Sequence, residues 1–356
     1  MRSRKLTYIQ KMSFLVPLIV SLLTVCARSQ TSLGFKCQSS ATCRAMAGFS
    51  PENKTTIDAV QKLFHVADLE TLLSANGLLP STLPTLAIQP SQALKIPFDC
   101  ICSRSNLYGV ASNPPLYTVK SGDTLDIIAS KIFSRLVTFL QIATFNKIAD
   151  PNLIEVGQNV SIPLPCSCDR VDGVDVLHYE HVVSPGSNVS GIAQQFGVSD
   201  EILLSLNGMA NASSLLAYQL LDIPLRVCNS SVTNSSLDYP MLVPVGTYFY
   251  TANNCVNCSC GPAGNFTLQC SSSGIENLNC PSMTCSGLAL GNTTTTACSS
   301  STCSYIGVHN NGSILTETVT QDSCQNHHSG AHVHAKFKFW KSAVVTILAV
   351  LSTYIM

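Results

Sequence analysis

The sequence predicts an α+β fold of three small modules clamped by disulfides, followed by a small cysteine-rich region. Two observations lead to this prediction: a repeat of about 60 to 70 residues and a total of seventeen cysteines. Each repeat ends in Ile-Pro followed by Phe or Leu, and an asparagine stands 16 or 20 residues before that isoleucine. The asparagine and isoleucine pairs are Asn76 and Ile96, Asn146 and Ile162, and Asn207 and Ile223.

The middle repeat indicates the order of elements within one module. Residues 117–119 are β-prone, and Thr124 is a good N-cap for a first helix whose apolar residues follow at helical spacing. A second helix is expected over residues 136–145, and a second strand over 158–162, which Pro163 ends. A strand–helix–helix–strand (βααβ) unit of about 45 to 50 residues is too small to be very stable alone. The cysteines between the units are therefore expected to stabilise them.

Composition excludes several classes of function. Lysine plus arginine and aspartate plus glutamate each total 20, so the chain has no basic surplus with which to bind nucleic acid. Glycoside hydrolysis needs two positioned carboxylates, and neither a dense acidic motif nor a Ser/His/Asp arrangement stands out. We therefore expect a protein that is not an enzyme and needs no cofactor. Its neutral balance suits an uncharged ligand, because ionised groups in the site would be desolvated without a partner.

Both ends of the chain carry the pattern of processing signals. A basic start, an apolar stretch and small residues predict a secretory signal peptide over residues 1–29. Three small residues, a polar spacer and an apolar tail predict that residues 330–356 are replaced by a glycosylphosphatidylinositol (GPI) lipid, with a short tail anchor as the alternative. The attachment residue is expected to be Ser329, with Gly330 and Asn326 as alternatives. These signals place the protein on the extracellular face of the plasma membrane.

A secreted chain of this kind is expected to be glycosylated and disulfide-bonded. Cys26 lies in the signal peptide, which leaves an even sixteen cysteines. Ten Asn-x-Ser/Thr sequons predict N-glycosylation. They are Asn53, Asn159, Asn188, Asn211, Asn229, Asn234, Asn257, Asn265, Asn292 and Asn311.

The motifs of the middle repeat resemble a LysM module. The resemblance rests on Tyr-Thr-Val-Lys-Ser-Gly-Asp-Thr-Leu at 117–125, on Asn146, on Asp-Pro-Asn-Leu-Ile-Glu-Val-Gly-Gln at 150–158 and on Ile-Pro-Leu at 162–164. Three such units separated by Cys-x-Cys, with both end signals, resemble the plant LysM proteins of the chitin elicitor-binding type. The predicted domains are a degenerate first module over 37–100, a second over 113–164, a third over 175–225, and the cysteine-rich region over 228–325.

Spacing alone does not choose among the pairings of the six repeat cysteines. The LysM resemblance implies the pairs Cys37–Cys102, Cys43–Cys168 and Cys100–Cys166, while the partner of Cys228 stays open. Cysteines 255, 258 and 260 could be read as a metal site, but the sequon at Asn257 and the oxidising compartment favour disulfides. The histidine-rich tract at 327–334 is interpreted as spacer. We therefore expect no metal.

The resemblance implies that chitin binds between two loops of the second module. Backbone groups there would bind the acetamide, and Leu153 and Ile154 would cover its methyl group and the sugar ring. In the alternative interpretation, Thr124 only caps a helix and Ile154 only fills the core. The first loop contributes Lys120, Ser121, Gly122, Asp123, Thr124, Leu125 and Asp126. The second loop contributes Lys147, Ile148, Ala149, Asp150, Pro151, Asn152, Leu153 and Ile154.

The sequons indicate which module is open to ligand. Aligning Thr56, Thr124 and Asn188 places Asn53 in the first loop of the first module, and Asn188 and Asn211 in the two loops of the third. Our hypothesis is that glycans crowd these two modules and leave the second accessible.

The resemblance implies a cell-surface receptor for chitin oligomers in plant innate immunity. Without a kinase domain of its own, it would signal through a LysM receptor-like kinase, and a long oligomer could bring two copies together as a homodimer. The alternatives are a receptor for bacterial peptidoglycan and a protein that tethers the wall without signalling.

Overall fold

The computed structural model describes residues 33–38, 40–103, 107–262, 265–276 and 278–322. The predicted signal peptide, the predicted anchor signal with its attachment candidates, and Cys324 lie outside the described residues. Within the described part, no helix has the length and apolar character needed to cross a membrane.

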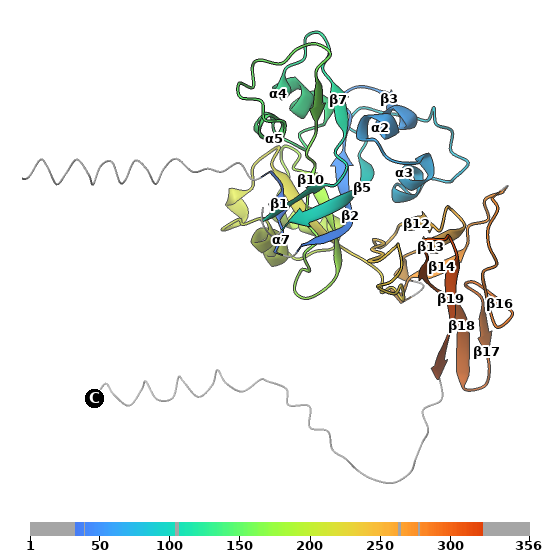
Figure 1. The fold of residues 1–356 in the computed structure, drawn as a ribbon. Helices are drawn as coiled ribbons and strands as arrows, with labels where there is room; N and C mark the ends of the chain where they lie inside the picture. The colour runs from blue at the N-terminus through green and yellow to red at the C-terminus, as the bar shows by residue number, and fades with distance from the viewer. Residues whose placement is uncertain (1–32, 39, 104–106, 263–264, 277, 323–356) are drawn as a thin grey trace, which may run out of the picture.

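Three βααβ modules follow one another along the chain (Figure 1). Module 1 consists of β2 (Ala41–Phe49), α2 (Ile57–Phe64), α3 (Leu69–Ala75) and β5 (Leu94–Ser103), with the short pair β3 (Thr55–Thr56) and β4 (Ala87–Ile88). Module 2 consists of β7 (Leu116–Thr118), α4 (Leu125–Ile127), the π-helical turn η1 (Ile128–Ile132), α5 (Phe139–Phe145) and β8 (Asn159–Ser161). Module 3 consists of β10 (Val176–Val182), α6 (Val189–Phe196), α7 (Asp200–Leu206), the 3₁₀ turn η2 (Ala212–Ser214) and β11 (Leu220–Arg226).

The first helix of each module begins after a side chain that caps it. Thr56, Thr124 and Asn188 each accept a hydrogen bond from the backbone N–H three residues on. These are the three positions that the sequence alignment of the repeats makes equivalent. In module 2 the helix departs from the expected α spacing, because Phe133 donates to the carbonyl of Ile128 (3.0 Å), five residues back, as in a π turn.

The repeated asparagine joins the second helix of each module to its second strand. Asn146 is the C-cap of α5, and its Nδ2 donates to the carbonyl oxygens of Ile142 (2.8 Å) and Ser161 (2.7 Å). Its Oδ1 accepts from the backbone N–H of Ser161 at 2.8 Å. Asn76 and Asn207 make the same three bonds in modules 1 and 3. The partner on the strand is always the residue before the Ile-Pro pair, which explains the repeat of the two motifs.

Modules 1 and 3 share one sheet, of order β1-β6-β5-β2-β10-β11, in which β9 also pairs with β6. The two modules meet where β2 and β10 run parallel, with Met46 opposite Tyr179. The additional strands are β1 (Phe35–Lys36), β6 (Tyr108–Ala111) and β9 (Pro165–Cys166). Strands β7 and β8 of module 2 form a separate antiparallel pair.

Module 2 packs directly on module 1. One hydrophobic cluster contains core residues of both modules. Four aromatic rings cross it edge to face: Phe49 and Phe64 lie 4.9 Å apart, Phe64 and Phe133 lie 5.5 Å apart, and Phe133 and Tyr117 lie 6.1 Å apart. Module 3 has its own cluster around α6 and α7.

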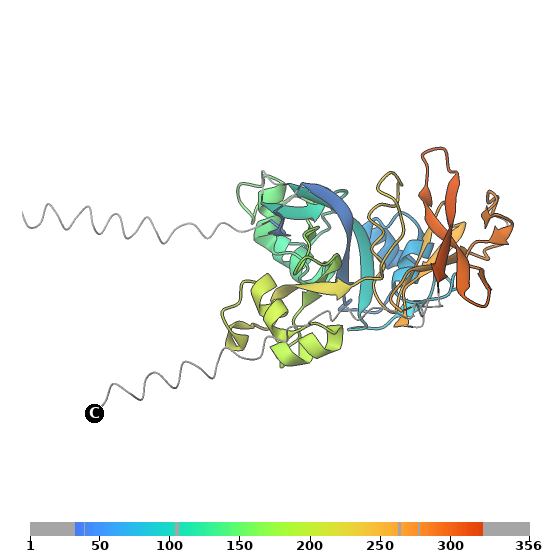
Figure 2. The same cartoon turned by 90° about the horizontal axis from the view of Figure 1, so that it is seen from below.

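Disulfides fasten the three modules together. The bonds are Cys37–Cys102, Cys43–Cys168 and Cys100–Cys166, the same pairs that the LysM resemblance implies. Their sulfurs gather in a small cluster beside β2, β5 and β9. The modules therefore form one body, as Figures 1 and 2 show, and not a flexible string.

The C-terminal region is a set of short antiparallel sheets beside module 1 (Figure 2). Its strands are β12 (Tyr248–Thr251), β13 (Val256–Ser259), β14 (Gln269–Ser272), β15 (Thr284–Cys285), β16 (Leu288–Ala289), β17 (Thr293–Thr295), β18 (Ser299–Val308) and β19 (Ile314–Asp322). Its disulfides are Cys228–Cys260, Cys255–Cys280, Cys258–Cys270 and Cys285–Cys303. All three cysteines of the 255–260 motif are thus disulfide-bonded, and Cys228 has its partner there.

Candidate functional site

The two predicted ligand loops of module 2 meet at their bases. Gly157, three residues after the second loop, donates to the carbonyl of Val119 (2.8 Å), and Val119 donates to the carbonyl of Gln158 (2.9 Å). Val119 directly precedes the first loop. The hairpin of β7 and β8 therefore holds the two loops side by side at one end of the module.

A partly buried network of hydrogen bonds fixes the first loop. One carboxylate oxygen of Asp123 accepts from the backbone N–H of Lys120 (2.7 Å) and from the hydroxyl of Tyr117 (2.9 Å). Burial and the bond to Asp123 raise the pKa of Tyr117, so the phenol remains a donor. Gly122 has a φ of 90°, a region that favours glycine, and no protein atom lies within 4 Å of where its Cβ would be. The loop is thus rigid, and its backbone at Gly122 stays open to solvent.

The second loop is also closed by local hydrogen bonds. Asn152 donates its backbone N–H to the Asp150 carboxylate (3.0 Å), and Leu153 donates to the Asp150 carbonyl (2.9 Å). Lys147 has a φ of 57° just after the helix cap Asn146. These turns leave Leu153 73% exposed on the loop.

Not every predicted contact residue lies at the surface. Leu125 was expected in the site, but its side chain is 1% exposed and belongs to the core, because it starts the buried face of the first helix. Thr124 caps that helix, and Ile154 packs against the core while partly exposed. Sequence reasoning missed Val156, which is 70% exposed beside Gly157. The sequence feature that could have indicated it is an apolar residue directly before a turn glycine.

Comparison with known proteins identifies the modules. The LysM domain model matches residues 117–163 and 181–224, which cover modules 2 and 3. A protein from Arabidopsis thaliana called LysM domain-containing GPI-anchored protein 2 is 45% identical over 73% of this chain and 74% of its own length. The Chitin elicitor-binding protein of Oryza sativa is 38% identical over 88% of both chains. The chain belongs to the LysM domain-containing protein family.

A relative of lower sequence identity is named as a receptor kinase. The Chitin elicitor receptor kinase 1 of Physcomitrium patens is 24% identical over 53% of this chain and 28% of its own length. The relatives named above are thus described as receptors, binding proteins or anchored LysM proteins.

The loops of the three modules share one backbone hydrogen bond at equivalent positions. The bond from Gly157 to Val119 recurs from Ser91 to Pro51 in module 1 and from Tyr218 to Val183 in module 3. The donor has a positive φ in all three modules, of 87°, 62° and 66°. Only module 2 has a glycine there, so only module 2 lacks a side chain at this point beside the groove.

The sequons of modules 1 and 3 lie in these same loops. Asn53, Asn188 and Asn211 are exposed. Asn211 takes the place of Asp150, because its side chain accepts from the backbone N–H two residues on at 3.0 Å, as Asp150 does in module 2. Asn159 of module 2 is exposed on β8, outside both loops. Among the remaining sequons, Asn257 is half-buried on the middle strand β13.

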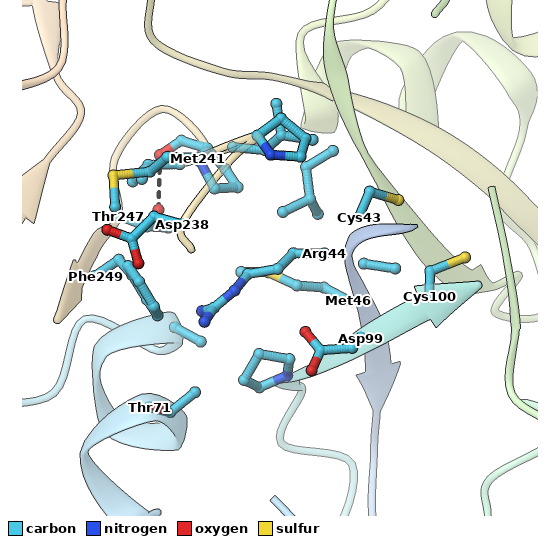
Figure 3. Close-up of a pocket in the computed structure, with 18 of the residues that line it drawn as sticks. Cys43, Arg44, Met46, Thr71, Asp99, Cys100, Asp238, Met241, Thr247 and Phe249 are labelled. Carbon is cyan, nitrogen blue, oxygen red and sulfur yellow. Dashed lines mark hydrogen bonds between the residues drawn. The ribbon is translucent and has the colours of Figure 1, made fainter. Parts of the chain in front are cut away.

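The cavity drawn in Figure 3 lies away from the module 2 loops. It measures about 380 Å³ and separates β2 and α3 of module 1 from the segment before β12. Arg44 extends across it, and its guanidinium lies 3.7 Å from the centre of the Phe249 ring. Burial lowers the pKa of Arg44 against the opposing effect of Asp99 and Asp238. This arrangement is a contact between the modules and the C-terminal region.

A second set of ionisable side chains is buried on β10 and β11. Glu180 lies opposite Asp222, and His178 binds both oxygens of Asp222 at 2.8 and 2.9 Å. The two carboxylates of Glu180 and Asp222 are 1% and 3% exposed, so they do not face a ligand. Burial, together with the charge of Asp222, raises the pKa of Glu180 well above its ordinary value. No hydrogen-bond partner for the Glu180 carboxyl is present among the described residues.

Proposed function

We propose that this chain is a cell-surface receptor or co-receptor that binds chitin oligomers through the two loops of module 2. The observation that carries the proposal is the open pair of rigid loops, with exposed Leu153 and Val156 beside free backbone at Gly122. N-acetylglucosamine needs hydrogen-bonding groups for its acetamide and apolar cover for its methyl group. The loops of module 2 offer both without an unpaired buried charge.

The other modules are proposed to be blocked by their own glycans. Asn53, Asn188 and Asn211 lie in the loops that would bind sugar in modules 1 and 3. A branched glycan on any of them would occupy the space in front of the loops. Module 2 has its single sequon, Asn159, on a strand instead.

The relatives' names support the cellular setting that we propose. Two of them are called GPI-anchored or chitin elicitor-binding proteins and align with most of this chain. We propose GPI attachment at Ser329, after removal of the signal peptide, and display on the outer face of the plasma membrane. Signalling in plant innate immunity would then need a LysM receptor-like kinase, and a long oligomer bound to two copies would gain affinity through effective concentration.

Paired leucine substitutions test the proposed groove. Burying an exposed leucine under a ligand contributes about 2 kcal/mol, so Leu153→Asp should weaken binding of a chitin octamer about tenfold or more. Leu216→Asp is the matched control, because Leu216 is an exposed leucine (67%) in the second loop of module 3. Calorimetry on the secreted glycoprotein measures both, with peptidoglycan fragments as a parallel titrant.

Three results are informative in this experiment. A loss confined to Leu153→Asp supports the module 2 groove. Equal losses in both variants, or no loss in either, would place chitin elsewhere. Tighter binding of peptidoglycan fragments than of chitin would replace the proposed ligand while keeping the site.

A further inference from the structure

A large cavity lies where all three modules meet, outside the two module 2 loops. It measures about 670 Å³, within the range of small-molecule sites. Modules 1 and 3 face it with residues of their loops, including Ser91 and Tyr218, and module 2 closes it with residues of the segment after its first helix. None of the residues 120–126 and 147–154 lines it. The cavity exists only because the modules are held together.

Contacts between the modules shape its walls. Ser134 of module 2 donates to the carbonyl of Ser50 in module 1 at 2.6 Å. Lys131 of module 2 forms an ion pair with Glu52 of module 1. These two contacts hold the module 2 segment against module 1 beside the cavity.

The cavity carries a surplus of positive charge, although the chain as a whole is neutral. Lys95, Lys131 and Arg135 line it, against the single carboxylate of Glu52. Lys131 is paired with Glu52, whereas Lys95 has no ion-pair partner within the described ranges. Burial lowers the pKa of Lys95, so its ammonium is already partly desolvated and lacks a counter-charge.

Arg135 is held in place from module 3. Its guanidinium lies 4.4 Å from the centre of the Tyr218 ring, and both residues have a positive φ. This contact orients the guanidinium of an exposed side chain at the cavity, where it can donate charge-assisted hydrogen bonds to an anion.

The rest of the lining suits a sugar. Six serines contribute hydroxyls, and the aromatic side chains of Tyr179, His181, Phe196 and Tyr218 contribute apolar surface. His181 packs against Tyr179 and Phe196, and burial lowers its pKa, which keeps the ring uncharged at neutral pH. The serine hydroxyls can bond to the hydroxyls of a sugar, and the aromatic rings can cover its carbon ring. The cations Lys95 and Arg135 can bind a negative charge on the same ligand.

We propose that this cavity binds a saccharide that carries a carboxylate. The carboxylate lies between Lys95 and Arg135, and the sugar ring lies against Tyr218 and the serines. The site goes beyond the chitin groove of module 2, takes an anionic instead of an uncharged ligand, and uses none of the groove residues. The sequons Asn53 and Asn188 each lie one residue beyond the lining residues Glu52 and Ser187, so the glycans that we propose to block modules 1 and 3 would also border this cavity.

The experiment is a calorimetric titration of the secreted protein, with its glycans and after enzymatic deglycosylation. The probes are trigalacturonic acid, its uncharged trimethyl ester and sodium sulfate. We expect the acid to bind and the ester to bind at least tenfold more weakly, because the ester loses charge-assisted hydrogen bonds. Binding by either glycoform supports the site.

Substitutions locate the binding. Lys95→Met and Arg135→Gln should each weaken trigalacturonic acid about tenfold or more. Lys62→Met is the matched control, since Lys62 is an exposed lysine of module 1 on α2, outside the cavity. All three variants should keep the wild-type melting temperature and the wild-type affinity for chitin octamer.

Several outcomes would overturn the proposal. These are no binding of trigalacturonic acid to either glycoform, equal affinity for acid and ester, or an equal effect of Lys62→Met. Sulfate binding as tight as that of the saccharide would reduce the cavity to a simple anion site. A normal chitin affinity in the same samples separates failure here from failure of the module 2 groove.

Discussion

Replacing Asn146 by alanine should destabilise module 2 more than any other change to a polar side chain near its loops. The substitution removes three hydrogen bonds of 2.7 to 2.8 Å that join α5 to β8. Each contributes about 1 kcal/mol net, so we expect a loss of about 3 kcal/mol in the free energy of unfolding. Since α5 and β8 frame the second ligand loop, chitin affinity should fall as well.

Urea denaturation, monitored by hydrogen exchange of module 2, measures the change. Asn146→Asp keeps the Oδ1 acceptor but sets a carboxylate oxygen against the carbonyl oxygens of Ile142 and Ser161 at the C-terminal end of α5, so it should destabilise at least as much as alanine. Asn152→Ala is the control, because the side chain of Asn152 bonds only within the exposed turn. An Asn146→Ala protein within about 0.5 kcal/mol of wild type would show that the three bonds do not hold the module together.

Two further predictions concern the buried charges. Arg44→Ala removes the cation–π contact with Phe249, which contributes about 0.5 to 2 kcal/mol. Hydrogen exchange of the β12 amides should become up to about thirtyfold faster, while that of the β10 amides should not change. Unchanged exchange in β12 would contradict the assigned contact. Glu180→Gln should stabilise the protein, and more so at higher pH. The pKa of Glu180 is higher in the folded than in the unfolded state, so its favourable contribution is present at low pH and is lost as pH rises above the ordinary glutamate value of 4.5. A difference in melting temperature that is the same at pH 4.5 and pH 8 would refute this.

The repeat motifs were sufficient to predict the three βααβ modules, because caps and strand ends are local features. Thr124 caps its helix as its position predicts, and the alignment with Thr56 and Asn188 holds in the structure. The disulfide pairs came from the family resemblance, since spacing alone left them open. The role of Asn146 needed the structure, because its partner Ser161 lies across the module.

Long-range arrangement was beyond the reach of the sequence. No local pattern indicates that β2 pairs with β10, about 130 residues later. The same limit applies to the three-module cavity, because the sequence does not indicate that loops of modules 1 and 3 face the segment after the first helix of module 2. Within the groove, helical spacing marked Leu125 as apolar but did not tell core from surface. Val156 was overlooked because it lies beyond the predicted loop, which ended at Ile154.

The parallel pairing of β2 with β10 has a practical consequence for the smallest usable fragment. A protein truncated after module 2 would uncover the edge of β2 at Met46 and Ala47, where Tyr179 and Glu180 of β10 pair with it. Unpaired edges of this kind promote aggregation, and such a fragment would also lose Cys168, the partner of Cys43. A soluble ligand-binding fragment should therefore extend at least through β11, even though the proposed chitin groove ends about seventy residues earlier.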